Sequence, residues 1–228
     1  MKQITIAIPT LARYDLLERL CNEILREESI EYKLRIVILD NGGNLSTTNF
    51  LSDVRKHKPF DEALVEIMTP GYNLGVAGSW NYFAKELGRC IIANDDVIFS
   101  KSTIDCFEKS SISNPKVILF ENSKPNEGFS TFLLNQPKVW LEMGGFDEVF
   151  NPAYFEDLDC KYRLALSGNP VGKVDLEGWH HDNSSTLNNS SYEYKRMHWC
   201  LYLRNQKYYS LKWGGKPGKE KFRSPFNQ

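Results

Sequence analysis

Two adjacent carboxylates interrupt the apolar stretch IIANDDVIF, which runs from Ile91 to Phe99. The carboxylates of Asp95 and Asp96 repel each other, so their charge is best tolerated beside a divalent cation or in full solvent. Hard cations such as Mg²⁺ or Mn²⁺ take oxygen ligands and keep positions open for substrate phosphates. Taken alone, the pair fits either a metal site, a solvated turn, or the N-cap of a helix that begins near residues 100–102.

A second acidic group lies in AYFEDLDCKYRLALSG, where Glu156 and Asp157 follow two aromatic residues. Carboxylates in a partly apolar pocket are suited to act as a general base. The helix dipole also favours acids at the start of a helix, so helix capping is an alternative for the same residues. Asp159 and Arg163 are four residues apart, which is the spacing of a structural ion pair on a helix.

Two further segments have residue types that bind ligands. His180 and His181 follow the strand-like VDLEGW, and because neighbouring strand residues point to opposite faces, one of them would face inward as a metal ligand. Ordinary core or surface histidines are the alternative. The stretch GYNLGVAGSWNYF allows close backbone approach to an anion before a predicted helix, although it matches neither a P-loop nor a dinucleotide fingerprint.

Short β-rich runs alternate with helical patterns in the first half of the chain and must position these residues. Strands are predicted at residues 4–9, 34–40, 63–69 and 90–95. The alternation predicts an α/β fold with a Rossmann-like, mostly parallel sheet flanked by helices. All four predicted strands lead into small, polar or turn-forming residues, and ligands bind beyond the carboxyl ends of such strands. A binding crevice is therefore expected at this edge.

The second half is less regular, and it ends in a strongly aromatic helical pattern whose rings are either core or an acceptor platform. Its strands and helices are predicted at 117–120, 129–134, 137–143, 155–166 and 190–213. We expect a single domain over residues 1–228. Within it, we predict a nucleotide-binding half at about 1–97, an acceptor and catalytic half at about 98–189, and a C-terminal helix and tail at 190–228.

The composition of the 228 residues is that of a globular protein, with 41% hydrophobic and 25% charged residues. A net charge of -1 gives no overall attraction for nucleic acid or anionic membranes. The five cysteines include no C-x-x-C pair, and the N-terminal apolar run is too short for a signal peptide. We therefore expect a cytoplasmic protein without a transmembrane segment.

The order of the motifs resembles that of family 2 type glycosyltransferases (GT2), which have the GT-A fold. The similarity covers about residues 4–186, and it is carried by IAIPTLARYDLLERL, IVILDNGG, NLGVAGSWNYF, IIANDDVIF, GGFDEVFNPAYFEDLDCKYRL and the late His pair. The tail KWGGKPG…PFN looks like that of small bacterial and phage members; for a phage-encoded protein, the expected cytoplasm is that of the host. The resemblance implies a nucleotide-sugar donor, Mn²⁺ or Mg²⁺, and inversion at the anomeric carbon. We favour a UDP-sugar over a dTDP-sugar or GDP-sugar.

The resemblance also implies roles on the donor side. Asp40 would contact the base or ribose in a nucleotide pocket, and Asn94 stands where the D-x-D metal motif of the family has its first Asp. We therefore expect Asp96 to be the main metal ligand and Asp95 to hold the ribose or the donor sugar. The other residues implied in nucleotide and donor binding are Pro9, Thr10, Arg13, Asn41, Asn73, Gly75 and Asn81.

On the acceptor side, Asp157 matches the general base of the family, with Glu156 in support. His180 or His181 would complete the metal shell; the choice depends on strand register, and we slightly favour His180. The residues implied in shaping the sugar and acceptor pocket are Gly144, Gly145, Phe146 and Asp147.

Two alternatives to this function stay open at the level of sequence. A nucleotidyltransferase also sets acids and a metal at the mouth of a nucleotide-binding sheet, but it would carry a glycine-rich element after the first strand, where PTLARYD has no glycine. A non-catalytic module that binds a sugar nucleotide or glycan is the second alternative. The acceptor is not specified by any motif; a glycan, a lipid-linked sugar, a protein or a modified DNA base are all compatible with the sequence.

Overall fold

A computed structural model describes residues 2–11, 13–26, 32–45, 50, 64–99, 102–121, 128–176, 180–181 and 191–228. Its main sheet is built from β1 (Lys2–Thr10), β2 (Tyr32–Asp40), β3 (Leu64–Met68), β4 (Cys90–Ala93), β6 (Ile118–Glu121), β7 (Thr131–Leu134) and β8 (Gly172–Val174). The strand order is β3-β2-β1-β4-β7-β6-β8. A small second sheet pairs β5 (Val97–Ile98) with β9 (His180–His181).

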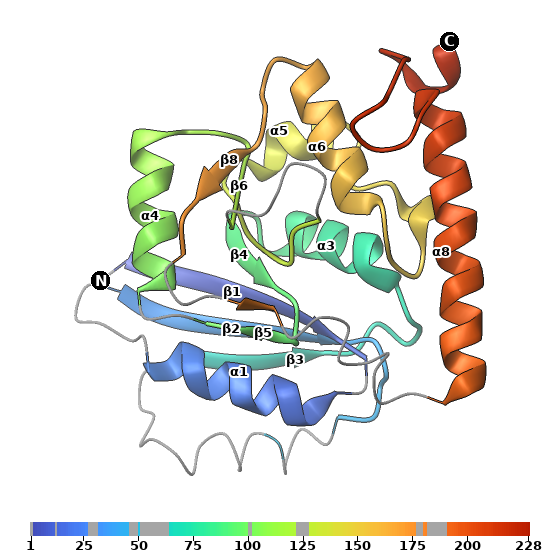
Figure 1. Ribbon diagram of the computed structural model, residues 1–228. Coiled ribbons are helices and arrows are strands. Elements are labelled where there is room, and N and C mark those ends of the chain that lie inside the picture. The colour runs from blue at the N-terminus through green and yellow to red at the C-terminus, as the bar shows by residue number, and fades with distance from the viewer. Residues whose placement is uncertain are drawn as a thin grey trace.

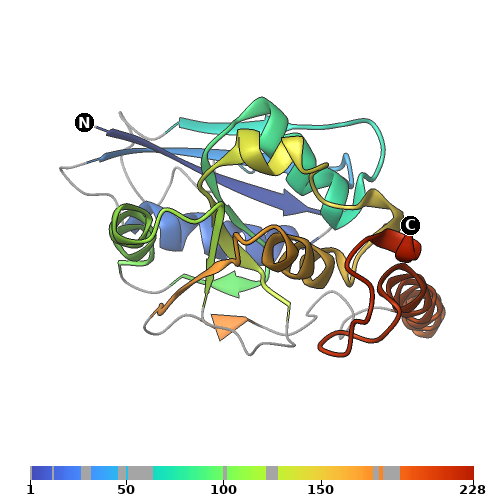
Figure 2. The same ribbon diagram turned by 90° about the horizontal axis from the view of Figure 1, so that it is seen from above.

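Helices cover both faces of the main sheet (Figures 1 and 2). They are α1 (Tyr14–Arg26), α3 (Gly75–Glu86), α4 (Thr103–Ser113), α5 (Pro137–Glu142), α6 (Glu156–Leu166) and α8 (Tyr192–Trp213), with short 3-10 turns η1 (Glu148–Phe150) and η2 (Pro225–Asn227). Each of the strands and helices expected from the sequence is present within a few residues of its predicted bounds. Among the described residues, no helix combines the length and the apolar character that crossing a membrane requires.

The sheet is mostly parallel, as predicted, and β7 is the exception. Strands β1, β2, β3 and β4 run parallel to one another, whereas β7 is antiparallel to both β4 and β6. An antiparallel pair needs no crossover helix, which agrees with the short stretch of chain between β6 and β7. The pairing of β1 with β4 covers only Ile6 and Ala7, so Pro9, which has no N–H group, costs no ladder hydrogen bond to β4.

Alternation along β1 divides its side chains between two cores. Ile4, Ile6 and Ile8 pack with α1 on one face of the sheet, and Ala7 faces the aromatic core around α3 and α5 on the other. Because both faces of the strand are buried in its middle, its sequence is continuously apolar from Ile6 to Pro9. The carboxyl ends of β1 and β2 emerge on the side of the molecule along which α8 lies (Figures 1 and 2).

The C-terminal half of α8 forms a third apolar cluster, which covers the segment before α6. Tyr209 and Trp213 are 1% exposed and pack with Phe150 and Phe155. The first half of the same helix behaves differently, because Tyr192 is 74% exposed. The aromatic helix predicted from the sequence is confirmed, and its fully buried rings, Tyr209 and Trp213, lie in its second half.

Candidate active site

The ends of β1 and β4 are joined by a hydrogen bond between two of the predicted site residues. The hydroxyl of Thr10 donates to Oδ2 of Asp95 over 2.7 Å. Burial raises the pKa of Asp95 to about 7, with a further rise from the charge of Asp96, while the Thr10 hydrogen bond acts in the opposite direction. A half-buried pair of like charges of this kind is stabilised by a cation. Asn94 is fixed through its backbone N–H group, which donates to the carbonyl of Ser130 over 2.8 Å.

Arg13 brings a positive charge to the same end of β1. Its guanidinium pairs with Asp15 at 2.7 Å, and Nη1 is buried without a hydrogen-bond partner among the described residues. The pKa of Arg13 is raised first by the hydrogen bond to Asp15, and the charges of Asp95 and Asp96 add to the rise. An unused, buried guanidinium nitrogen near two carboxylates is suited to a phosphate oxygen.

Asp40, at the end of β2, shapes the loop that follows it. The carboxylate is 1% exposed, and it accepts hydrogen bonds from the Tyr14 hydroxyl at 3.0 Å and from the N–H groups of Gly42 at 3.1 Å and Leu45 at 2.8 Å. The carboxylate of Asp40 thus fixes the loop after β2, and its expected contact with a base or ribose stays a prediction.

Asn41 ties the end of β2 to the start of α3. Its Nδ2 donates to the Ser79 hydroxyl over 2.9 Å, and its Oδ1 accepts from the N–H group of Leu74 over 3.0 Å. In the same turn, Oδ1 of Asn73 accepts from the N–H group of Gly75 over 2.8 Å. These contacts fix the path of the predicted donor-side loop.

Gly75 and Asn81 join this loop to the second half of the chain. Gly75 has φ +69°, and a Cβ atom there would lie 2.7 Å from Nδ2 of Asn151, so only glycine fits. Asn81 Oδ1 accepts from the N–H group of Phe146 at 2.7 Å, and its Nδ2 donates to the carbonyl of Phe146 and to Glu148, each at 2.8 Å. The amide of Asn81 is thus used within the protein and positions residues 146–148.

Three of the residues expected to shape the sugar and acceptor pocket, Gly144, Gly145 and Phe146, have structural roles in the turn after α5 and in the core. Phe146 is 1% exposed, and its ring packs edge-on against Trp80 and Trp140, each with centroids 5.0 Å apart. Its side chain belongs to the core, because the aromatic cluster encloses it. Gly144 and Gly145 both have positive φ, and they turn the chain after α5. A Cβ at Gly145 would lie 2.6 Å from Oδ1 of Asn81.

Glu156 and Asp157 form a buried acidic pair at the first turn of α6. The N–H group of Phe129 donates to Oδ2 of Asp157 at 2.9 Å, and that of Leu158 donates to Oδ1 at 2.7 Å. Burial raises the pKa of both carboxyl groups; Lys161 opposes the rise at Asp157, whereas the neighbouring charge of Asp157 adds to the rise at Glu156. Oε2 of Glu156 is buried without a hydrogen-bond partner among the described residues. The rise in pKa is larger at Glu156, where the charge of Asp157 adds to burial, than at Asp157, where Lys161 and backbone N–H groups oppose it.

Tyr154 connects the two acidic groups. It has φ +81°, and the next residue, Phe155, has φ +77°, a conformation that non-glycine residues rarely adopt. Burial raises the pKa of Tyr154, and the charges of Glu156 and Asp96 both add to the rise. The Tyr154 hydroxyl thus lies within electrostatic range of an acid from the turn after β4 and of an acid from α6.

The backbone of β9 brings the histidine segment to the same region. His181 pairs with Val97 and His180 with Ile98, directly after the Asp95 and Asp96 carboxylates. The side chains of both histidines lie outside the described residues, so the choice of metal ligand stays a prediction. In the described part of the chain, no group of three or more His, Cys, Asp and Glu side chains is close enough to hold a metal. The two carboxylates and the adjacent imidazole-bearing strand nevertheless have the donor chemistry of a divalent cation site.

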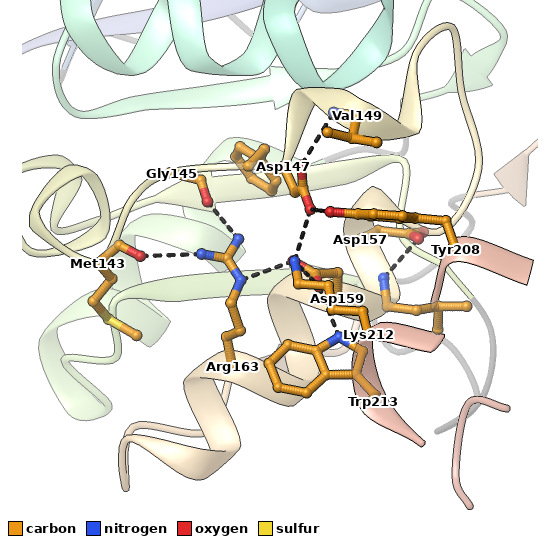
Figure 3. Close-up of polar contacts among 12 residues, drawn as sticks. Met143, Gly145, Asp147, Val149, Asp157, Asp159, Arg163, Tyr208, Lys212 and Trp213 are labelled. Carbon is orange, nitrogen blue, oxygen red and sulfur yellow. Dashed lines mark hydrogen bonds and ion pairs between the residues drawn. The ribbon is translucent and has the colours of Figure 1, made fainter. Parts of the chain in front are cut away.

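A buried ionic network, which sequence reasoning missed, holds α8 against this region (Figure 3). Nζ of Lys212 lies 2.7 Å from Oδ2 of Asp147 and 2.7 Å from Oδ1 of Asp159. Arg163 pairs with Asp159 at 2.8 Å, which confirms the predicted i,i+4 ion pair. The signal for Lys212 is its position on the buried face of α8, three residues after Tyr209. Asp147, expected to line the pocket, is an anchor for α8.

A second residue missed from the sequence is Glu121, at the end of β6. Its carboxylate is 1% exposed and accepts from the N–H groups of Ser130 at 2.8 Å and Thr131 at 3.2 Å. Burial raises its pKa to about 7. An isolated Glu after an apolar strand carries no sequence signal for such a role.

No family profile and no curated protein matches the amino-acid sequence. Solved structures do match the fold. A mannosyltransferase from Pyrobaculum calidifontis, in complex with GDP-Man and Mn²⁺, superposes with a TM-score of 0.65 and 14% identity over 94% of this chain and 66% of its own. S. aureus TarS 1-349 in complex with UDP-GlcNAc superposes with a TM-score of 0.60 and 12% identity over 90% of this chain and 72% of its own.

The chain thus spans about two thirds of the mannosyltransferase length and has the same fold as both proteins. The α/β fold predicted from the sequence, a GT-A-like mostly parallel sheet flanked by helices with a C-terminal aromatic helix, is confirmed.

Proposed function

We propose that this protein is a metal-dependent glycosyltransferase that moves a sugar from a nucleotide-sugar donor to an acceptor hydroxyl. The observation that carries the proposal is the segment before β7, where the carbonyl of Ser130 accepts from the N–H group of Asn94 over 2.8 Å and the N–H group of Phe129 donates to Oδ2 of Asp157 over 2.9 Å. An acid pair suited to a cation and an acid pair suited to proton transfer therefore border one space. The fold supports the donor class, because the mannosyltransferase that shares it binds GDP-Man with Mn²⁺ and TarS binds UDP-GlcNAc.

The donor side is assigned to the ends of β1, β2 and β4. Thr10 orients Asp95 through the 2.7 Å hydrogen bond, which leaves Asp95 to bind the ribose or donor sugar. Arg13 contributes a buried guanidinium nitrogen for a phosphate oxygen. Asp96, with His180 or His181, would hold Mn²⁺ or Mg²⁺, and the bound ion would neutralise charge on the leaving nucleoside diphosphate. We favour a UDP-sugar as the donor.

The acceptor side is assigned to the start of α6. Asp157 removes the proton from the acceptor hydroxyl as that oxygen bonds to the anomeric carbon, and the bond from this carbon to the phosphate oxygen breaks. Attack from the face opposite the leaving group inverts the anomeric centre, so no covalent enzyme intermediate forms. Glu156 keeps its proton because burial and the Asp157 charge both raise its pKa. The base therefore carries a single negative charge, stabilised by the N–H groups of Phe129 and Leu158.

The experiment that tests this function is a donor screen with the purified chain. UDP-, dTDP- and GDP-sugars are each incubated with Mn²⁺, with Mg²⁺ or with a chelator, and release of the nucleoside diphosphate is measured. We expect one nucleotide class to be turned over with metal and the rate to fall to background with the chelator. Absence of release from every donor would contradict the proposal, and metal-dependent binding without release would indicate a non-catalytic binding module.

A further inference from the structure

Four aromatic side chains from the first half of α8 and from the segment before α6 form one chain of ring contacts. Tyr194, His198 and Tyr202 recur every four residues on one face of α8, and the last two contact Tyr154 from the segment before α6. The Tyr154 ring lies edge-on to His198, with centroids 5.8 Å apart, and to Tyr202 at 5.5 Å. The His198 ring lies 4.8 Å from that of Tyr194. We call these four residues the aromatic wall.

The aromatic wall is held rigidly at its Tyr154 end. Asn205 of α8 is fully buried, and its Nδ2 donates to the carbonyls of Phe150 at 2.6 Å and Ala153 at 2.8 Å. These bonds fix the segment in which Tyr154 and Phe155 have positive φ. Strained backbone persists only where the surroundings hold it, and it concentrates at ligand-binding sites. The backbone that carries the Tyr154 ring is therefore held in place. Tyr154 is followed by Phe155 and then by the acidic pair at the start of α6.

The aromatic wall also has unused polar groups. Nδ1 of His198 is buried without a hydrogen-bond partner in the described part of the chain, while Nε2 lies 3.1 Å from the Tyr194 hydroxyl. Burial lowers the pKa of His198, so its ring is neutral at pH 7. All four side chains of the wall are half-buried, which leaves part of each ring open to solvent. Rings with a few fixed polar groups are the composition of sites for amphipathic ligands such as sugars.

We propose that the aromatic wall is the acceptor subsite and that the acceptor is a carbohydrate. The pyranose ring packs against Tyr202 and Tyr154, and one of its hydroxyls hydrogen-bonds to Nδ1 of His198. This arrangement directs a neighbouring hydroxyl toward Asp157, which lies three residues after Tyr154. The proposal rests on the glycosyltransferase function above and extends it, because it names the class of acceptor and the residues that select it.

The test compares two rates in the same enzyme, both measured as nucleoside diphosphate release from the donor found in the screen. One rate is with water as the only acceptor, and the other is with a mono- or disaccharide of glucose, galactose, mannose, N-acetylglucosamine or N-acetylgalactosamine. We expect at least one sugar to raise the wild-type rate. In Tyr202→Ala the ratio of the sugar rate to the water rate should fall about tenfold, the scale of one aromatic contact. His198→Ala should lower the same ratio.

Two control variants separate this role from general damage to the fold. Tyr202→Phe keeps the ring and should keep the ratio. Tyr192→Ala removes a 74% exposed ring that is not part of the aromatic wall and should keep the ratio as well. General misfolding lowers both rates together and leaves the ratio unchanged.

Either of two results would overturn the inference while leaving the glycosyltransferase function standing. The first is a ratio in Tyr202→Ala within about twofold of wild type. The second is a wild-type enzyme that releases nucleotide but is stimulated by no sugar, which would point to a protein, lipid or nucleic-acid acceptor. If no donor is turned over at all, the glycosyltransferase function itself fails.

Discussion

The hydroxyl of Thr10 donates a 2.7 Å hydrogen bond to Oδ2 of Asp95, across 85 positions of sequence. The contact joins the last residue of β1 to the turn after β4, so it fixes one carboxylate of the acidic pair relative to the sheet. It also opposes the rise in the Asp95 pKa that burial causes. The orientation of the Asp95 carboxylate is thus set by the side chain of Thr10, which comes from a separate strand.

Removing this hydroxyl tests its contribution to the donor site. Thr10→Val keeps the shape of the side chain, which is 3% exposed, and removes the hydroxyl group that donates the hydrogen bond to Asp95. We expect kcat/KM for nucleotide release to fall about tenfold, because a hydrogen bond to a charged group is worth about 1.5 kcal/mol. Thr10→Ser retains the hydroxyl and should retain most of the activity. Equal kcat/KM values for Thr10→Val and wild type would show that the contact is dispensable.

Lys161 should set the acidic limb of the pH profile. It lies one turn after Asp157 on α6, with Nζ 4.2 Å from the Phe120 ring centroid, and its charge lowers the Asp157 pKa against the larger effect of burial. A base acts only when ionised, so activity falls as the pH drops through its pKa. In Lys161→Met that pKa rises, and the acidic limb of kcat/KM should move to higher pH.

Lys161→Arg keeps the charge and should keep the acidic limb near its wild-type position. A Lys161→Met enzyme whose rate falls equally at every pH would show that Lys161 has only a structural role.

The buried ion pairs of Lys212 should matter for stability. The side chain is 7% exposed and bridges Asp147 and Asp159. Lys212→Met leaves Asp147 without its cation, whereas Arg163 still neutralises Asp159. We expect a loss of about 3 kcal/mol in the free energy of unfolding, the low end for breaking a buried pair. Urea unfolding measures it, with exposed Lys207→Met as the control, expected to change stability by less than about 0.5 kcal/mol.

A loss below about 1 kcal/mol in Lys212→Met would contradict this account of the network. It would mean that the aromatic packing of α8, rather than the ion pairs, holds the helix in place.

Glu121 should make stability depend on pH. Its folded-state pKa is about 7, above the usual 4.5, so the folded protein holds a proton that the unfolded chain releases. The stability that this proton contributes is complete below about pH 4.5 and is lost as the pH rises to about 7. Glu121→Gln does not titrate. The free energy of unfolding of the wild type, relative to that of Glu121→Gln, should therefore fall by about 2 kcal/mol between about pH 5 and pH 7.5. A constant gap in urea unfolding across this range would contradict the raised pKa.

The fold could be predicted from the sequence because its signals are local. Alternating β-rich runs and helical spacing identified the strands from Ile4 to Asp95 and the helix that opens at Glu156. The reversed direction of β7 carries no such signal, since a parallel and an antiparallel strand with both faces buried have the same apolar composition. The order of the motifs along the chain also identified the two acidic pairs, but it did not give the distance between the pairs.

The roles of single side chains were harder to predict, because they depend on partners far away in sequence. Asn81 looked like a donor-binding residue, yet its amide is used by Phe146 and Glu148. No sequence signal singled out Lys212, yet its ammonium group is buried between two carboxylates. Such long-range contacts follow from packing, which periodicity does not encode.

The most direct test of the central claim is the effect of Asp157→Asn on turnover and donor binding, measured side by side. Asparagine keeps the shape of the side chain but cannot take a proton, so the transfer rate to the best acceptor should fall about 10²–10⁴-fold. The donor dissociation constant, from calorimetry, should change little, and Asp175→Asn, at an exposed position, should match wild type in both. An Asp157→Asn enzyme with transfer within about threefold of wild type would contradict the claim that Asp157 is the general base.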